Sequence, residues 1–270
     1  TFSSMSQALD YFYEKKLALE QLEKHKHTLT KVLTKELERN NKKRGLQEET
    51  VIQAKKAEPY RIMGELLTAN IYKIKKGDGE IIVENFYDSN NLLTIPLERN
   101  LTPAQNAQSY FRKYNKAKIS AEGASKQLLL TNEEINYLES VLQSVTQADS
   151  LHEVEEIKQE LIKEKYIKLP IIKKAKPHKE IQTKPQLLSF LSSAGFPILV
   201  GKNNKQNDLL TVKIAKDHDL WFHVKDIPGS HVIVQTNGQK IPDSTLEEAA
   251  LLAAYYSKGQ TSSQVPVDWT

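Results

Sequence analysis

The stretch Asp219-Leu-Trp-Phe-His-Val-Lys-Asp-Ile-Pro-Gly-Ser-His-Val-Ile-Val234 decides the fold of the carboxy-terminal region. Apolar residues alternate with polar or aromatic ones from position 220 to 225, and this period of two predicts a half-buried strand. A tight turn should follow, because Pro228 fixes φ and Gly229 permits a positive φ. The alternation resumes at 231–234. We therefore expect two neighbouring strands joined by a short connection.

Sequence on both sides extends these strands into an α+β domain. Residues 197–200 predict a strand, and the polar turn 201–207 leads into a short helix expected at 208–215. An amphipathic helix is expected at 244–257, capped by the serine or threonine at its start. A further strand begins at 265–269.

The amino-terminal part predicts a long helix over residues 3–58, which Ser4 or Ser6 could cap. The polar run 40–45 should break or weaken it. A narrow leucine stripe with charged flanks is typical of the seam of a coiled coil or helical hairpin. The stripe consists of Leu19, Leu22, Leu29, Leu33 and Leu37.

A second long helix should pair with the first. Thr102 and Pro103 are a good helix start, and the helical pattern extends to about residue 148. Capping boxes at 131–134 and 150–153 predict that this arm is divided into consecutive helices, the last one reaching Tyr166.

Between the arms, Pro59 starts a helix expected at 60–75, and two short strands are expected at 80–86 and 91–97 with a turn at 88–91. Each leucine seam alone would face water, so we pair the arms as a long antiparallel coiled-coil hairpin with a small β tip. A compact helical bundle is the alternative.

Residues 169–185 contain three prolines and a single acid among many lysines. Such a sequence builds no core and stays extended, either as a solvated tether or as a phosphate-contacting arm. The lysines of this predicted basic linker include Lys173, Lys174, Lys176 and Lys179. The predicted organisation is a hairpin at 1–167 with its β tip near 77–100, a basic linker at 168–185 and an α+β domain at 186–270.

Composition excludes some classes of protein. No run approaches the ~20 apolar residues needed to span a bilayer, and residues 1–20 lack a basic and then apolar secretion signal. The chain has no cysteine, which excludes disulfides and thiolate metal sites and fits a reducing compartment. The net charge of +4 is mild, but its lysines cluster. Neither terminus resembles a natural chain end, so we expect a piece of something longer.

An enzyme is not expected. His223 and His231 are eight positions apart across a turn, which suits no standard zinc spacing. Ser230 has no nucleophile-elbow motif around it, and no phosphate-binding loop of the P-loop type occurs. No cofactor and no metal site are predicted.

Nucleic-acid binding fits the residue pattern better. The 201–207 turn is rich in lysine and amide donors, which contact phosphates, and Trp221, His223 and Lys225 should share a strand face where flat rings can stack on unpaired bases. The alternative is that Trp221 packs as core under the carboxy-terminal helix. The candidate RNA-binding residues are Lys202, Asn203, Asn204, Lys205, Asn207, Trp221, His223, Lys225, Ser230 and His231.

Several motifs resemble those of the NFACT family. The motifs D-x-W-F-H-V-K-D-x-P-G-S-H-V-x-V (219–234) and I-L-V-G-K-N-N-x-Q-N-D (198–208) resemble its RNA-binding NFACT-R domain. The motifs G-E-L-L-x-A-N-x-Y (64–72), N-F-Y-D (85–88) and T-P-x-x-N-A-Q-x-Y-F-x-K-Y (102–114) resemble its coiled-coil middle region. The resemblance covers nearly the whole chain, with the family's amino-terminal half absent.

This resemblance implies a ribosome quality control factor that binds the large ribosomal subunit, with tRNA and rRNA, on obstructed complexes in the cytoplasm. In the family such proteins promote alanine tailing of stalled nascent chains, and the residues tied to tailing lie in the absent half. The alternative that the resemblance implies is a cell-surface adhesin that binds fibronectin. A purely structural coiled-coil protein is a third reading, but it leaves the α+β domain without a purpose. The sequence does not determine the oligomeric state.

Overall fold

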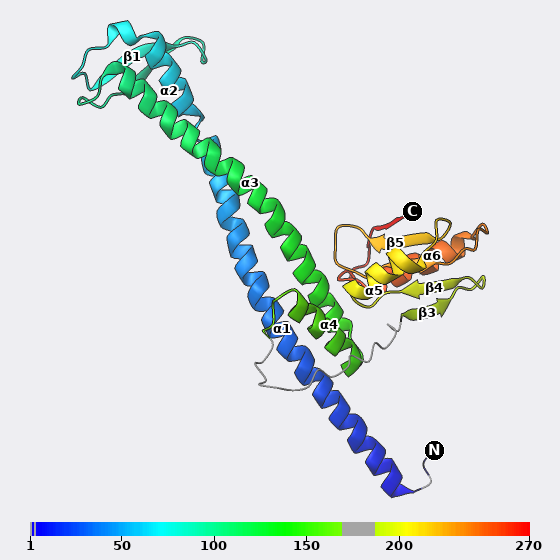
Figure 1. Cartoon of the computed structure of the whole chain (residues 1–270). Helices are drawn as coiled ribbons and strands as arrows, with labels where there is room; N and C mark the ends of the chain where they lie inside the picture. Colours follow the sequence, from blue (N-terminus) through cyan, green and yellow to red (C-terminus); the bar gives the residue numbers. More distant parts are fainter. Residues whose placement is uncertain (1, 3, 169–186) are drawn as a thin grey trace. The chain divides into compact units, whose positions relative to one another are not determined.

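A computed structural model describes residue 2 and residues 4–168 and 187–270 (Figure 1). The chain divides into two compact units, one formed by Thr1–Arg39 with Ile135–Thr270 and the other by Asn40–Glu134. Residues 169–185 of the predicted basic linker, with Lys173, Lys174, Lys176 and Lys179, lie outside the described residues. Within the described part of the chain, no helix is both long and apolar enough to cross a membrane.

Two long helices, α1 (Met5–Lys55) and α3 (Pro103–Gln147), confirm the two predicted arms. The Ser4 hydroxyl accepts from the Gln7 amide at 3.3 Å and caps α1. Thr102 caps α3 reciprocally, because its hydroxyl accepts from the Gln105 amide while the Gln105 side chain accepts from the Thr102 amide.

Neither helix breaks at the two places where the sequence suggested a break. The helix α1 continues through 40–45, because a glycine inside a helix costs only about 1 kcal/mol, which tertiary packing overrides. The capping box expected at 131–134 is absent, since α3 continues there too. Thr131 is buried and its hydroxyl donates to the Gln127 carbonyl at 2.9 Å, a bond made inside a continuous helix.

The first unit has a base of three helices. The helix α4 (Leu151–Lys163) packs against α1 and α3, and the Ser150 hydroxyl caps it by accepting from the Glu153 amide at 3.2 Å, as the second capping box predicted. The shared core contains Leu22, Leu29, Leu33, Leu138, Val141, Val145, Val154, Ile157 and Leu161. Leu19, which was assigned to the seam, is 59% exposed.

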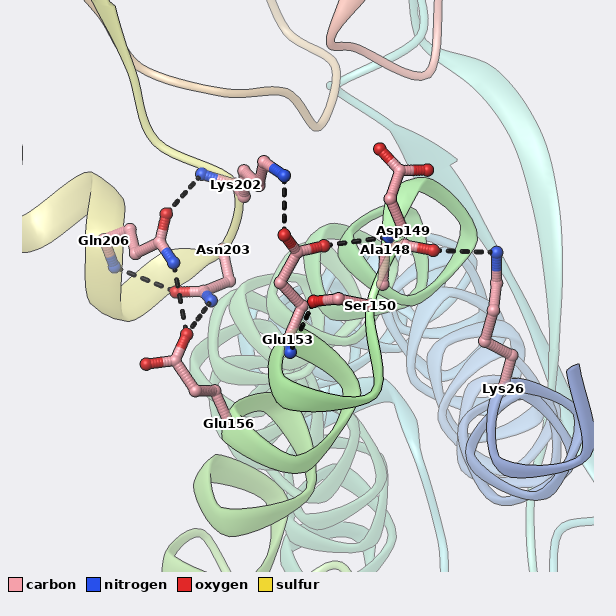
Figure 2. Close-up of polar contacts among 9 residues, drawn as sticks. All are labelled: Lys26, Ala148, Asp149, Ser150, Glu153, Glu156, Lys202, Asn203 and Gln206. Atoms are coloured by element: carbon pink, nitrogen blue, oxygen red, sulfur yellow. Dashed lines mark hydrogen bonds and ion pairs between the residues drawn. The ribbon is translucent and has the colours of Figure 1, made fainter. Parts of the chain in front are cut away.

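The helices α1 and α3 run antiparallel to each other. The Lys26 ammonium on α1 donates to the Thr146 carbonyl near the end of α3 at 2.9 Å. It also donates to the Ala148 carbonyl, directly after α3, at 3.1 Å (Figure 2). Carbonyls at a helix end have no partner within the helix, so a lysine there satisfies them.

The second unit contains the predicted small β element. The strands β1 (Glu80–Asn85) and β2 (Asn91–Pro96) pair antiparallel, and the helix α2 (Glu58–Ala69) and the 3-10 turn η1 (Ile71–Lys73) precede them. Its core contains Leu66, Leu67, Ile74, Val83, Ile95, Leu97, Ala107 and Tyr110.

The α+β domain is a five-stranded antiparallel sheet with helices (Figure 1). Its strand order is β3 (Leu188–Leu191), β4 (Pro197–Val200), β6 (Val232–Val234), β5 (Leu220–Val224) and β7 (Val267–Trp269). The helix α6 (Asp243–Tyr255) packs on one face. The strand β3 was missed, whereas the other four were predicted.

The polar turn after β4 is shorter than predicted. A short helix, α5 (Asn204–Asp208), begins inside it and continues into a π-helical segment, η2 (Leu209–Ile214). The early start follows from Asn203, whose side-chain oxygen accepts from the Gln206 amide at 2.9 Å and so acts as the cap.

Candidate nucleic-acid interface

Three aromatic rings meet on one face of the central strands. The Trp221 and His223 rings stack with centroids 5.7 Å apart, and the His231 ring meets both edge-on, at 5.4 Å from Trp221 and 5.3 Å from His223. We call these three residues the ring cluster. Register explains it, because Trp221 pairs with Ile233 and His231 lies two residues before Ile233 on the same side.

The opposite face of the same strands is the hydrophobic core. Phe222 and Val224 are fully buried and pack with Ala249 and Ala253 of α6. Since alternate strand residues point to opposite faces, Trp221 does not lie under α6. The interpretation of Trp221 as core beneath the carboxy-terminal helix is therefore wrong.

The two histidines are held neutral at physiological pH. Burial lowers the pKa of His231 to about 4, and the neighbouring His223 adds to the effect. Burial also lowers the pKa of His223. The Nδ1 atom of His231 lies 2.7 Å from the Thr211 hydroxyl of η2, which fixes the ring. The cluster thus offers flat, uncharged rings, and the positive charge beside it comes from the exposed Lys225.

The Trp221 indole nitrogen is buried and has no hydrogen-bond partner among the described residues. A buried donor without a partner costs free energy that a protein usually avoids. The rest of the Trp221 side chain is partly exposed, so the residue belongs to the surface of the domain as well as to its packing.

The turn between β5 and β6 differs from its prediction. Gly229 does not have a positive φ; Asp226 has, with φ 57°. Glycine is needed at 229 for another reason, because a Cβ there would lie 3.0 Å from the Ser257 Cβ, where the two residues form a bridge. Aspartate tolerates the left-handed region better than most residues, so the turn places it at 226.

The predicted phosphate-binding loop is ordered by its own side chains. We call residues 202–207 the amide loop. The Gln206 side-chain oxygen accepts from the Lys202 amide at 3.1 Å, and the Asn207 side chain accepts from the His231 amide at 3.1 Å. Gly201 makes room for Asn207, because a Cβ at 201 would lie 2.3 Å from the Asn207 Oδ1 atom.

Acidic residues of α4 accept hydrogen bonds from the side chains of the amide loop, as Figure 2 shows. The Lys202 ammonium pairs with Glu153 at 2.5 Å. The side-chain amides of Asn203 and Gln206 donate to one oxygen of Glu156, at 3.4 and 3.1 Å. Lys202, Asn203 and Gln206, whose side chains were predicted as phosphate donors, therefore donate to carboxylates of α4 in this structure.

Asn204 is engaged in the same way. Its side-chain amide donates to Glu160 at 3.1 Å, and its oxygen accepts from the Ser140 hydroxyl of α3 at 2.7 Å. Glu160 also accepts from the Tyr137 hydroxyl at 3.0 Å, and burial raises the pKa of this glutamate.

The remaining candidates differ in accessibility. Lys205 and Lys225 are exposed. Ser230 is buried, and its amide donates to the Tyr256 carbonyl at 2.9 Å, so its backbone serves the fold. Sequence reasoning counted Gln206 among the loop donors, but it missed the packing role of Gly201 and the contacts of the acidic residues of α4. The spacing of Glu153, Glu156 and Glu160 by three and four was a visible signal, because it places them on one helix face.

A ring cluster on one face of a sheet, in a domain with exposed lysines, fits a nucleic-acid-binding class of protein. Comparison with known families agrees. The model of the NFACT N-terminal and middle domains matches residues 1–180, and that of the NFACT protein RNA binding domain matches residues 186–270. The chain belongs to the NFACT family.

Individual relatives are similar along all or part of the chain. The Rqc2 homolog RqcH of Bacillus subtilis is 41% identical over 273 residues, which cover 100% of this chain and 46% of the relative. The human ribosome quality control complex subunit NEMF is 30% identical over 86 residues, 31% of this chain and 8% of that protein. The chain spans about half the length of the bacterial relative.

A solved structure is similar as well. The structure of the C-terminal part of the fibronectin/fibrinogen-binding protein from Streptococcus suis aligns with a TM-score of 0.68 and 36% identity. The alignment covers 92% of this chain and 84% of the other.

Proposed function

We propose that this chain is an RNA-binding part of a ribosome quality control factor. The observation that carries the proposal is the ring cluster beside the exposed Lys225, in a domain that matches an RNA-binding family model. Flat rings stack on unpaired bases at about 1–3 kcal/mol per base, and lysine contacts the phosphates.

The proposed partners are the large ribosomal subunit and its rRNA and tRNA, on obstructed complexes in the cytoplasm. Relatives named for ribosome quality control in bacteria and in animals support this class of partner. We further propose that the chain supports alanine tailing of stalled nascent chains by binding, without catalysing a reaction itself.

The test is co-sedimentation of the protein with purified large ribosomal subunits, together with titration of labelled tRNA. Lys225→Glu should weaken both interactions and reduce the salt dependence of binding by about one counterion. Lys240→Glu is the matched control, because it makes the same charge change at another exposed lysine. Lys240 follows the end of β6, which pairs with the start of β5, whereas Lys225 follows the end of β5. Equal binding by the two variants and the unmodified protein would contradict the proposal for this face.

Fibronectin binding is the second candidate, because the similar structure from Streptococcus suis is that of a fibronectin/fibrinogen-binding protein. The same preparations should be tested with immobilised fibronectin. Saturable binding to fibronectin, with no co-sedimentation of ribosomal subunits, would replace the first proposal with this one and its cell-surface location.

A further inference from the structure

Two faces of the helix α4 make different contacts. Val154, Ile157 and Leu161 are buried in the hairpin base. Glu153, Glu156 and Glu160 follow a spacing of three and four on a neighbouring face, and we call them the acidic row. All three carboxylates contact the amide loop of the α+β domain, across 44 to 50 positions of sequence.

Every side-chain group that the loop directs at the acidic row is a hydrogen-bond donor. These groups are the Lys202 ammonium and the side-chain amides of Asn203, Asn204 and Gln206. Carboxylate oxygens and phosphate oxygens are both anionic acceptors that take such donors at similar distances. The acidic row therefore accepts hydrogen bonds from donors of the kind that also bind phosphate oxygens.

The loop is shaped without help from the acidic row. The Asn203 oxygen accepts from the Gln206 amide at 2.9 Å, and the Gln206 oxygen accepts from the Lys202 amide at 3.1 Å. Because the side-chain oxygens of Asn203 and Gln206 are used within the loop, the nitrogens of these two side chains point outward. The donors are thus preorganised, and either a carboxylate or a phosphate can take them.

The loop adjoins the ring cluster. Asn207 accepts from the His231 amide at 3.1 Å and donates to the Gly229 carbonyl at 3.4 Å, so the loop and the β5–β6 turn are held together. RNA stacked on the ring cluster would bring its backbone close to the loop.

We propose that the acidic row is an intramolecular substitute for RNA phosphate, which holds the amide loop closed until RNA displaces it. This proposal rests on the RNA-binding function proposed above. The donors cannot serve both acceptors at once, and the carboxylates repel a nearby phosphate. The pairing of Lys202 with Glu153, at 17% and 14% exposure, is shielded enough from water to resist screening by salt.

The closed contact lowers apparent RNA affinity. The apparent dissociation constant equals the intrinsic one divided by the fraction of molecules with an open loop. If about one molecule in ten is open, release of the contact strengthens RNA binding about tenfold. This gain of affinity is the signature of the mechanism.

The test uses the full chain with the substitutions Glu153→Gln and Glu156→Gln together. Binding of a fluorescein-labelled unstructured RNA oligonucleotide is measured by anisotropy, and hydrogen exchange of the α5 amides reports opening of the loop. The control is Glu155→Gln with Glu164→Gln. Both residues are exposed; Glu155 lies in α4 and Glu164 directly follows it. Their substitution gives the same charge change at residues that do not contact the loop.

We expect the first variant to bind RNA about tenfold more tightly than the control, with faster exchange in α5. Faster exchange with unchanged affinity would overturn the proposal, because the contact would then not compete with RNA. Equal gains in both variants would overturn it too, since general charge would explain them. A weaker RNA affinity in the first variant than in the control would also overturn it, because the acids would then help RNA binding. If no variant binds RNA at all, the proposed function itself fails.

Discussion

The two faces of the five-stranded sheet arise from the same strands but differ in character. One face is apolar and covered by α6, with Phe222 only 1% exposed. The other carries Trp221, His223 and His231 and is bordered by α5 and η2. Strand alternation determines which residues share a face, but a helix from another part of the sequence decides which face becomes core. Mutations on the two faces should therefore separate stability from binding.

Phe222→Ala should give the largest effect. A fully buried phenylalanine truncated to alanine costs about 3–5 kcal/mol, because contacts and apolar burial are lost and a cavity remains. Chemical unfolding monitored by circular dichroism measures it. If the loss is smaller than that of Trp221→Ala, the assignment of the core face is reversed.

Trp221→Ala should mainly affect binding. The stacking role predicts that RNA affinity falls by about 1–3 kcal/mol, with a smaller loss of stability than Phe222→Ala causes. Anisotropy titration and unfolding of the same preparation measure the two quantities. A variant that unfolds early, yet binds RNA normally when folded, would assign recognition to lysines alone.

Much of the fold could be predicted from local sequence. The helix start at Ser150, the hairpin of β1 and β2, and the strands on either side of the 226–229 connection follow from caps, turns and alternation. The breaks expected at 40–45 and 131–134 failed, because local propensity is weak compared with packing along a continuous helix.

The candidate site was less predictable. The ring cluster was predicted in part, since alternation placed Trp221 and His223 on one face. The state of the amide loop could not be predicted, because Lys202 meets Glu153 across 49 positions of sequence. Local pattern identifies a donor-rich loop but does not show which acceptor it meets in the fold.

The face that carries the ring cluster, unlike the face under α6, should make the free energy of unfolding depend on pH. The pKa of His231 is lowered from 6.5 to about 4 in the folded state, chiefly by burial and then by His223, while Asp208 opposes the shift. The unfolded chain therefore binds the proton first. Stability should be complete above about pH 6.5 and fall as pH decreases toward 4.

The expected loss is about 1–2 kcal/mol, after allowance for partial exposure to solvent. Urea unfolding at several pH values measures it, and His231→Gln should remove this component while keeping a polar group near Thr211. Carboxylates also titrate near pH 4, so the comparison is the difference between the two curves. A difference that does not change between pH 6.5 and 4 would contradict the burial of this ring.

The smallest effects on stability should come from the connection at 226–229. This connection joins β5 and β6, whose pairing determines which side chains share each face of the sheet. Asp226→Gly should change stability by no more than about 0.5 kcal/mol, because relief of the left-handed backbone at φ 57° is offset by the greater freedom of glycine in the unfolded chain. Gly229→Ala should cost about 1 kcal/mol, since its Cβ would lie 3.0 Å from the Ser257 Cβ and the bridge must yield. Denaturant unfolding of both variants measures the pair. If Gly229→Ala is neutral while Asp226→Gly is clearly destabilising, close approach to Ser257 is not the reason that glycine occupies this turn.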